Sequence, residues 1–313
     1  MSKGPFEQSV LRTLAYFDIA YYPLTKEELF AFLWQPPAMG YEEFEEKLDK
    51  MFGRGELETM WGYYLLAGSE AIIENRRRKI VFTENKLKRA ARAAKKIRSV
   101  PFIKAIFVCN TVGSEQAAVE SDIDFLIITS PRRIWFVRFF TNFILRLWRL
   151  RTYGKKNANR VCLSFYLDSD RLNVAPWRVA DDDIHFAYWV HQMFPIYDPE
   201  DYYAKFLEAN NWTKRYLPYA AKSYKPTYRF TVNDSKLGKI WKKIWETMWG
   251  SAYGNFIEDQ AKAMQWQMLK LSVKEKSKLN DNGVVFADGV IKVHENDTRL
   301  GYRERWKEKV VEI

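Results

Sequence analysis

The chain has 313 residues and a formal net charge of +11, and 47% of its residues are hydrophobic while 28% are charged. This apolar fraction excludes an intrinsically disordered protein, and the length allows two or three domains that each have their own core. The first ten residues contain no apolar run of the length that a signal peptide needs, so a cytoplasmic location is expected.

Residues 1–72 are predicted to form three helices followed by two short strands. Apolar residues recur at helical spacing over 6–17, and Thr25 and Glu28 have the spacing of a capping box at the start of a second helix. A third helix is expected over 41–52, and the strands around Gly62. Three helices and a hairpin resemble a winged helix. The third helix is acidic, however, and phosphate would repel it, so the pattern favours a structural or protein-binding module.

Residues 73–99 are predicted to connect this module to the next domain as a basic helix. Residues 76–98 contain eleven basic side chains and a single acidic one, Glu84. Such a localised charge is typical of a protein that contacts a polyanion, which suggests a nucleic acid partner. The alternative is a solvated helix face, because Leu87, Ala90, Ala94 and Ile97 form an apolar stripe at helical spacing opposite the charges.

Residues 100–200 alternate short apolar runs with a helix, which predicts strands over 102–109, 125–129 and 161–167. The aromatic segment 134–150 lies between the second and third of these runs. Arginines interrupt it, so it contains no run of about 18 uncharged residues that could span a membrane. We expect this helix to pack on the sheet, and membrane association is not expected.

Residues 201–313 are predicted to be mostly helical. The tryptophans of 235–271 are expected to be buried between neighbouring helices, and 284–294 could form a hairpin or a strand pair. The predicted fold class is therefore α+β: a mixed sheet flanked by helices, an N-terminal winged-helix-like domain and a mostly helical C-terminal region.

The segment 105–129 carries the most informative pattern: a strand, a polar turn, and an Asp-Ile-Asp sequence that enters a second strand. Successive strand residues point to opposite faces, so Asp122 and Asp124 share one face while Ile123 and Phe125 point into the core. Two carboxylates that lie so close together repel each other unless a cation lies between them, and Mg²⁺ prefers oxygen ligands. The pattern therefore predicts a magnesium site.

This segment resembles the signature of the DNA polymerase beta superfamily of nucleotidyltransferases, in which a Gly-Ser turn precedes an Asp-x-Asp pair. The turn fits in two registers. Gly113-Ser114 lies seven residues before Asp122, whereas Asn110-Thr111 lies at the more usual spacing of about ten. In either register a hydroxyl and close-lying backbone amides would contact a triphosphate.

The resemblance also implies a third carboxylate on the strand after the Asp pair. Alternation over 161–168 places Cys162, Ser164 and Asp168 on one face. Ser164 occupies the position where an acid is expected, and Asp168 follows roughly 13 Å further along the strand. Either Asp168 serves or the site has only two protein carboxylates. Both cysteines lie in apolar runs, which favours a structural role over metal binding. Arg132, Arg133 and Arg160 could contact phosphates or simply be surface charges.

The resemblance implies a nucleotidyltransferase that uses two Mg²⁺ ions and moves a nucleoside monophosphate from a nucleoside triphosphate to an acceptor. The catalytic residues implied are Asp122, Asp124 and Asp168. The alternative is a catalytically degenerate relative that regulates by binding nucleic acid or protein. The acceptor and the oligomeric state do not follow from the sequence.

Overall fold

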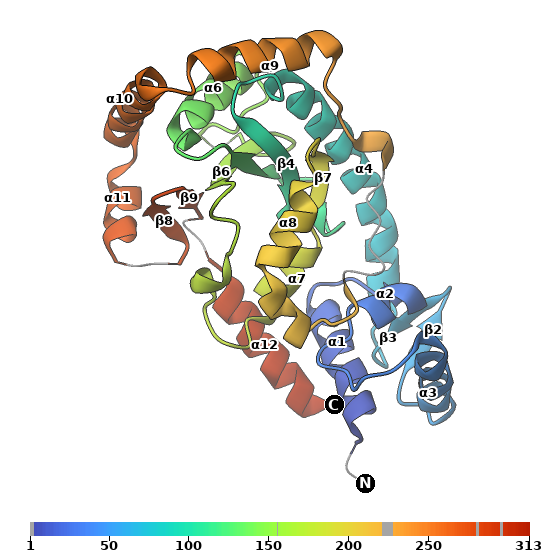
Figure 1. Ribbon diagram of the computed structural model, residues 1–313. Helices are drawn as coiled ribbons and strands as arrows, with labels where there is room; N and C mark the ends of the chain where they lie inside the picture. The colour runs from blue at the N-terminus through green and yellow to red at the C-terminus, as the bar shows by residue number, and fades with distance from the viewer. Residues whose placement is uncertain (1–2, 155, 221–227, 280–281, 295–296) are drawn as a thin grey trace.

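The computed structural model describes residues 3–154, 156–220, 228–279, 282–294 and 297–313. The N-terminal module consists of α1 (Pro5–Ile19), β1 (Leu24–Thr25), α2 (Lys26–Ala31), α3 (Tyr41–Gly53), β2 (Glu58–Met60) and β3 (Tyr63–Leu65) (Figure 1). Its strands form an antiparallel sheet in the order β1-β3-β2. The capping box predicted at the start of α2 is confirmed, because Glu28 N donates to Thr25 Oγ1 and Thr25 N donates to Glu28 Oε2.

Helix α4 (Ala71–Ile97) follows the N-terminal sheet and lies within two residues, at each end, of the basic helix predicted over 73–99. Two of its basic residues are buried. Arg76 pairs with Glu28 at 2.7 Å and lies over the rings of Tyr22 and Tyr63. Lys86 is 1% exposed. Part of the basic charge of this helix therefore holds the fold together and is not available to a partner.

The central sheet has six strands in the order β7-β4-β5-β6-β9-β8, and only the β5–β6 pair is parallel. It is built from β4 (Ile103–Cys109), β5 (Ile123–Thr129), β6 (Val161–Asp168), β7 (Phe194–Tyr197), β8 (Val284–Ala287) and β9 (Val290–Val293). The predicted hairpin over 284–294 is confirmed, and it extends the sheet at the edge of β6. Between β4 and β5 lies the single turn α5 (Asn110–Gly113).

Helices cover both faces of this sheet. On one face, α4 and α6 (Ile134–Leu147) pack over Ile106, Phe125 and Tyr166. On the other, α7 (Ile184–His191) and α8 (Tyr202–Ala209) pack over Phe107 and Leu126. The structure is thus a mixed α+β fold with helices on both sides of a mixed sheet, as expected, and α6 packs on the sheet as expected.

A β-bulge in β6 overturns the alternation expected for 161–168. Asp124 pairs with Cys162. Leu126 lies two residues after Asp124, but its partner Phe165 lies three residues after Cys162. The extra residue reverses the faces, so the Phe165 ring contacts Trp189 of α7 while Tyr166 OH lies 3.0 Å from Thr141 Oγ1 of α6. The expectation that Cys162 and Asp168 share a face was therefore wrong.

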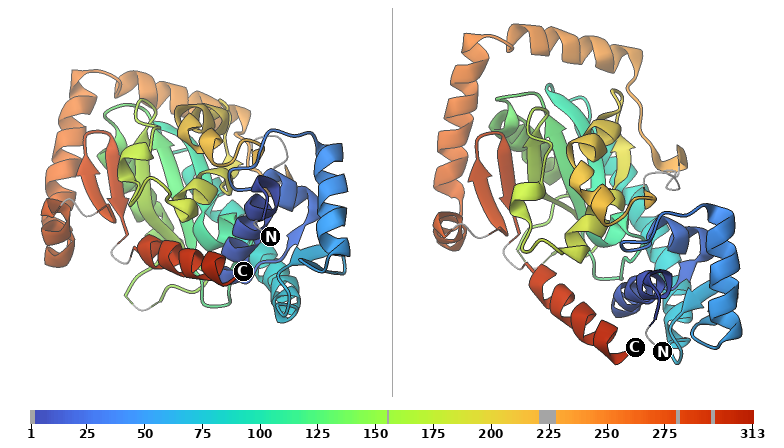
Figure 2. Two further views of the ribbon diagram at one scale, coloured as in Figure 1. Left: turned by 90° about the horizontal axis from the view of Figure 1, so that it is seen from below. Right: turned by 60° about the horizontal axis from the view of Figure 1, so that its bottom comes forward.

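The C-terminal region wraps around the sheet and returns to the N-terminal module. Helices α9 (Lys236–Met248), α10 (Ala252–Met268) and α11 (Leu271–Lys278) run along its periphery before the β8–β9 hairpin (Figure 2). Helix α12 (Arg299–Glu312) then packs against α1, where Trp306 joins the N-terminal core. Ile184 and Leu217 belong to the same core, so residues 1–72 do not bury their apolar surface alone. Among the described residues, no helix is long and apolar enough to cross a membrane.

Candidate metal and nucleotide site

The two aspartates predicted to share a face of β5 do lie together. Single side-chain ligand atoms of Asp122, Asp124 and Cys162 all lie within 4.8 Å of one another. Asp124 is buried and Asp122 is partly exposed. Within the described part of the chain neither carboxylate forms an ion pair, so no arginine or lysine occupies the space between them. The group has the size and the ligand types of a divalent cation site.

Burial and mutual repulsion govern the charge of this pair. Burial, followed by the negative charge of Asp122, raises the pKa of Asp124 well above its usual range. Burial also raises the pKa of Asp122, and the positive charges of Lys86 and Arg151 oppose that rise. A bound cation would remove the repulsion that keeps a proton on the pair.

Cys162 is the third member of the group, and the sequence pattern gave it no role in metal binding. The parallel register of β5 and β6 places it directly beside Asp124. Burial, together with the neighbouring carboxylates, raises the pKa of the Cys162 thiol to about 12. The thiol therefore stays protonated without a cation, and its presence lowers the pKa of each aspartate, in part opposing the effect of burial. A thiolate forms there only when a metal replaces the proton.

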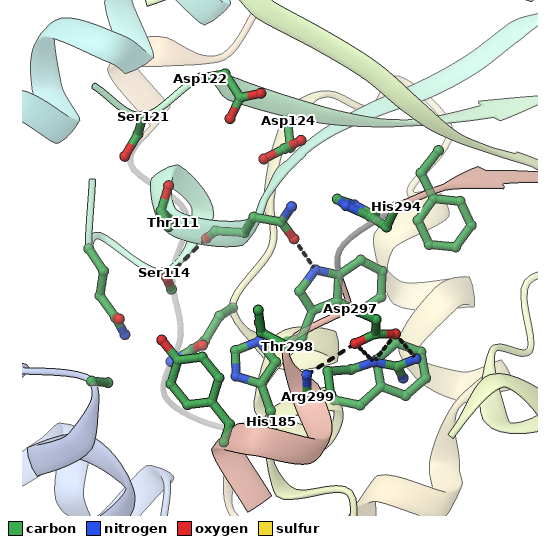
Figure 3. A pocket seen from close by; sticks show the side chains of 18 of the residues that line it. Thr111, Ser114, Ser121, Asp122, Asp124, His185, His294, Asp297, Thr298 and Arg299 are labelled. Carbon is green, nitrogen blue, oxygen red and sulfur yellow. Dashed lines mark hydrogen bonds and ion pairs between the residues drawn. The ribbon is translucent and has the colours of Figure 1, made fainter. Parts of the chain in front are cut away.

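Three residues of the polar turn after β4, Asn110, Thr111 and Ser114, line the same cavity as the aspartates. Asn110 has a φ of 55°, and its Oδ1 accepts a hydrogen bond from Trp189 Nε1 at 2.8 Å while its side chain also bonds Asp124. Thr111 and Ser114 line the cavity in front of the pair (Figure 3). Gly113 does not line this cavity. A Cβ at Gly113 would lie 2.7 Å from the Val108 carbonyl oxygen, so this glycine permits close packing of the backbone.

A buried lysine of α4 fixes the loop that precedes Asp122. Lys86 Nζ donates to the carbonyl oxygens of Val119 and Ser121, at 3.1 and 2.6 Å, and to Asn159 Oδ1 at 3.1 Å. The ammonium group of Lys86 thereby joins the loop before β5 to the loop before β6. Lys86 thus positions the start of the Asp pair, a role that its place in a basic run did not indicate.

The cavity in front of the Asp pair has a volume of about 330 Å³. The rest of its lining includes segments remote in sequence from the pair: His185 and Trp189 of α7, and His294, Arg299 and Tyr302 near the C-terminus. Figure 3 shows His294 near Asp124, and His185 and Arg299 further from the pair. Arg299 bonds Asp297 and Asp183, so its charge is already neutralised. Burial lowers the pKa of His185 and of His294 to about 4, so both imidazoles are neutral at physiological pH. No sequence motif marked these residues.

The structure does not bring Asp168 to the pair. It lies at the far end of β6, where Oδ1 accepts from Thr129 Oγ1 at 2.7 Å and Oδ2 accepts from Arg132 N at 3.0 Å. The guanidinium of Arg160 donates to the backbone oxygens of Arg149 and Arg151, and that of Arg133 donates to the Trp249 carbonyl. Neither arginine lines the cavity. Asp168 was predicted from regular alternation along 161–168, which the register shift between β5 and β6 interrupts.

Comparison of the chain with protein-family models, with curated proteins and with solved structures found no match. The geometry of the site therefore carries the functional argument.

Proposed function

We propose that this protein transfers a nucleoside monophosphate from a nucleoside triphosphate to an acceptor in a metal-dependent reaction. The main support for this proposal is the group formed by Asp122, Asp124 and Cys162. Their ligand atoms lie within 4.8 Å of one another, and the two aspartates line a cavity. The turn that holds Thr111 and Ser114 faces the same space. An Asp-x-Asp pair at a strand end opposite a hydroxyl-bearing turn is the arrangement that the resemblance to the polymerase beta superfamily leads one to expect.

The residues present fit a divalent cation. Asp122 and Asp124 would hold it through carboxylate oxygens, which suit Mg²⁺ or Mn²⁺, and Cys162 adds a softer ligand that suits Mn²⁺ or Zn²⁺ better than Mg²⁺. A bound cation would neutralise phosphate charge and acidify an acceptor hydroxyl. Asn110 orients Asp124 through its side-chain bond, and the Thr111 and Ser114 hydroxyls offer hydrogen bonds to phosphate oxygens.

Label transfer tests this proposal. The protein is incubated with each nucleoside triphosphate labelled at the α-phosphate, with Mg²⁺ or Mn²⁺, and with RNA, protein and small hydroxyl compounds as acceptors. We expect label on one acceptor class and release of pyrophosphate, both lost in Asp122→Ala and Asp124→Ala. Glu120→Ala is the matched control, since Glu120 is an exposed acid two residues before the pair and does not line the cavity. Transfer that persists without both aspartates would overturn the proposal.

A second candidate is a nucleotide-binding regulator that does not catalyse transfer. It is favoured by the third position of the group, which is Cys162 and not a carboxylate, while Asp168 lies elsewhere on β6. Calorimetry with Mg²⁺ and a nonhydrolysable triphosphate separates the two functions. Binding that requires Asp124 but yields no pyrophosphate with any acceptor supports the regulator.

Such a regulator would contact nucleic acid through the exposed side of α4. Lys88, Arg89 and Arg92 line a cleft beside Asn159, and all three are exposed. The expected partner is nucleic acid, and the affinity of the protein for it should fall as the salt concentration rises. Fluorescence anisotropy with a labelled oligonucleotide tests this, and Arg89→Glu with Arg92→Glu should weaken binding about uniformly across sequences.

A further inference from the structure

Helix α9 turns its apolar stripe away from the protein. Leu237, Ile240, Trp241, Ile244 and Met248 are 78%, 55%, 51%, 51% and 57% exposed. Their spacings of three, four and seven residues place them on one side of the helix. The expectation that the tryptophans of this region are buried was thus wrong for Trp241.

Polar side chains hold α9 to the rest of the fold. Lys242 Nζ donates to the Ile103 carbonyl oxygen at 2.6 Å and to Tyr197 OH at 3.0 Å, and Glu246 Oε1 accepts from Phe102 N at 2.7 Å. These two residues lie on the side opposite the apolar stripe. An ordinary surface helix buries its apolar side and exposes its charges, so the orientation of α9 is the reverse of the usual one.

A chain of aromatic rings that passes through the buried Phe136 links the exposed stripe of α9 to further exposed apolar residues on α6. Successive aromatic rings connect the two helices with centroids at most 6.5 Å apart, in the order Trp241, Trp245, Trp249, Phe136, Phe140, Phe139 and Phe143. On α6, Phe143 is 57% exposed and Leu147 is 69% exposed. Figure 1 shows α9 at the edge of the molecule with α6 beside it. We call the exposed apolar residues of these two helices together the α9–α6 surface.

Basic residues border the α9–α6 surface. Lys236, Lys239 and Lys243 are exposed along α9, and Arg146 and Arg149 are exposed at the end of α6. The single acid of α9, Glu246, is bound inward, and α6 contains none. A second copy of the chain would bring these positive borders against each other. An anionic partner surface would instead neutralise them.

We propose that the α9–α6 surface docks on an anionic membrane surface, with α9 lying parallel to the bilayer. A high contrast between an apolar stripe rich in Trp, Ile and Leu and a lysine-bearing flank is typical of interfacial helices. Each lysine near an anionic surface adds an electrostatic attraction that salt screens. The contact is peripheral and spans nothing. It does not depend on the proposed transferase activity.

Vesicle flotation of the full-length protein tests this inference. Vesicles of phosphatidylcholine alone are compared with vesicles that contain about a third phosphatidylglycerol at low and high salt. We expect flotation with the anionic vesicles and a reduction of about tenfold or more in the bound fraction for the double variant Ile240→Asp, Ile244→Asp. Lys239→Glu with Lys243→Glu should weaken binding at low salt in particular.

Leu300→Asp is the matched control, because Leu300 is 52% exposed on α12, away from the α9–α6 surface. All three variants change exposed positions, and thermal unfolding verifies that they fold. The inference is overturned if the Ile240→Asp, Ile244→Asp variant floats as fully as the wild type. It is also overturned if the wild type itself does not float with the anionic vesicles. If the wild type did not float but formed a dimer in the absence of vesicles, and the Ile240→Asp, Ile244→Asp variant were monomeric, the surface would instead bind a second copy of the chain.

Discussion

Cys162 lies beside Asp124 in the parallel register of β5 and β6, and its Sγ lies within 4.8 Å of a carboxylate oxygen of both Asp122 and Asp124. This pairing gives the proposed cation site two carboxylates and one thiol. Thiol ligands favour Mn²⁺ and Zn²⁺ over Mg²⁺, which prefers six oxygen ligands in octahedral geometry. The identity of one side chain on β6 should thus set the metal preference.

Cys162→Asp is expected to raise the affinity for Mg²⁺ by about tenfold, because it supplies a third hard oxygen ligand. Cys162→Ser, which is nearly isosteric, should leave Mg²⁺ binding close to that of the wild type but lower the affinity for Zn²⁺. Titration calorimetry measures both. Equal metal affinities in all three proteins would show that Cys162 does not contact the cation.

Asp124→Asn should stabilise the metal-free protein on the order of 2 kcal/mol at pH 8, because it removes a buried charge next to Asp122. The folded-state pKa of Asp124 lies above its unfolded value, so the charge costs nothing below about pH 4 and destabilises the fold increasingly as the pH rises above that value. Urea unfolding at pH 5 and pH 8 should therefore show a larger difference at pH 8. Addition of Mn²⁺ at pH 8 should stabilise the wild type but not Asp124→Asn. A difference independent of pH would mean that Asp124 carries its charge without penalty.

Local patterns predicted the parts of the fold that depend on neighbours in sequence. The capping box of Thr25 and Glu28 follows from a fixed spacing and is confirmed, and ligand atoms of Asp122 and Asp124, two residues apart, lie within 4.8 Å of each other. The face of Asp168 depends on a β-bulge. No residue type marked it, because the bulge follows from how β6 fits against β5 over several residues.

The remaining errors concern contacts between distant segments. His294 and Arg299 reach the cavity only because the β8–β9 hairpin joins the sheet at β6, more than a hundred residues after the Asp pair. The stripe of α9 was visible as a helical pattern, but periodicity cannot say which side of a helix faces the core. The inward bonds of Lys242 and Glu246 decide it.

Asn110 allows backbone strain and ligand positioning to be separated. Its φ of 55° suits glycine better than alanine, and its side chain bonds Asp124 and Trp189. Asn110→Gly and Asn110→Ala should lose metal affinity to the same degree. The free energy of unfolding, measured with urea, should be about 1 kcal/mol lower for Asn110→Ala than for Asn110→Gly. If Asn110→Ala lost more metal affinity than Asn110→Gly, the loss of affinity would come from backbone strain and not from the missing amide.

Lys86→Met should destabilise the protein by about 3 kcal/mol, because a buried ammonium that joins two loops is lost and its acceptors remain buried. Lys88→Met, two residues on, removes an exposed ammonium paired only with Glu84 at 2.9 Å and should change stability by less than about 0.5 kcal/mol. Urea unfolding compares the two. Metal affinity should also fall in Lys86→Met, since Ser121 precedes Asp122 directly and its carbonyl is one of the acceptors. If Lys86→Met and Lys88→Met behaved alike, the basic run would act as surface charge throughout, and the loop before β5 would have to be fixed by other contacts.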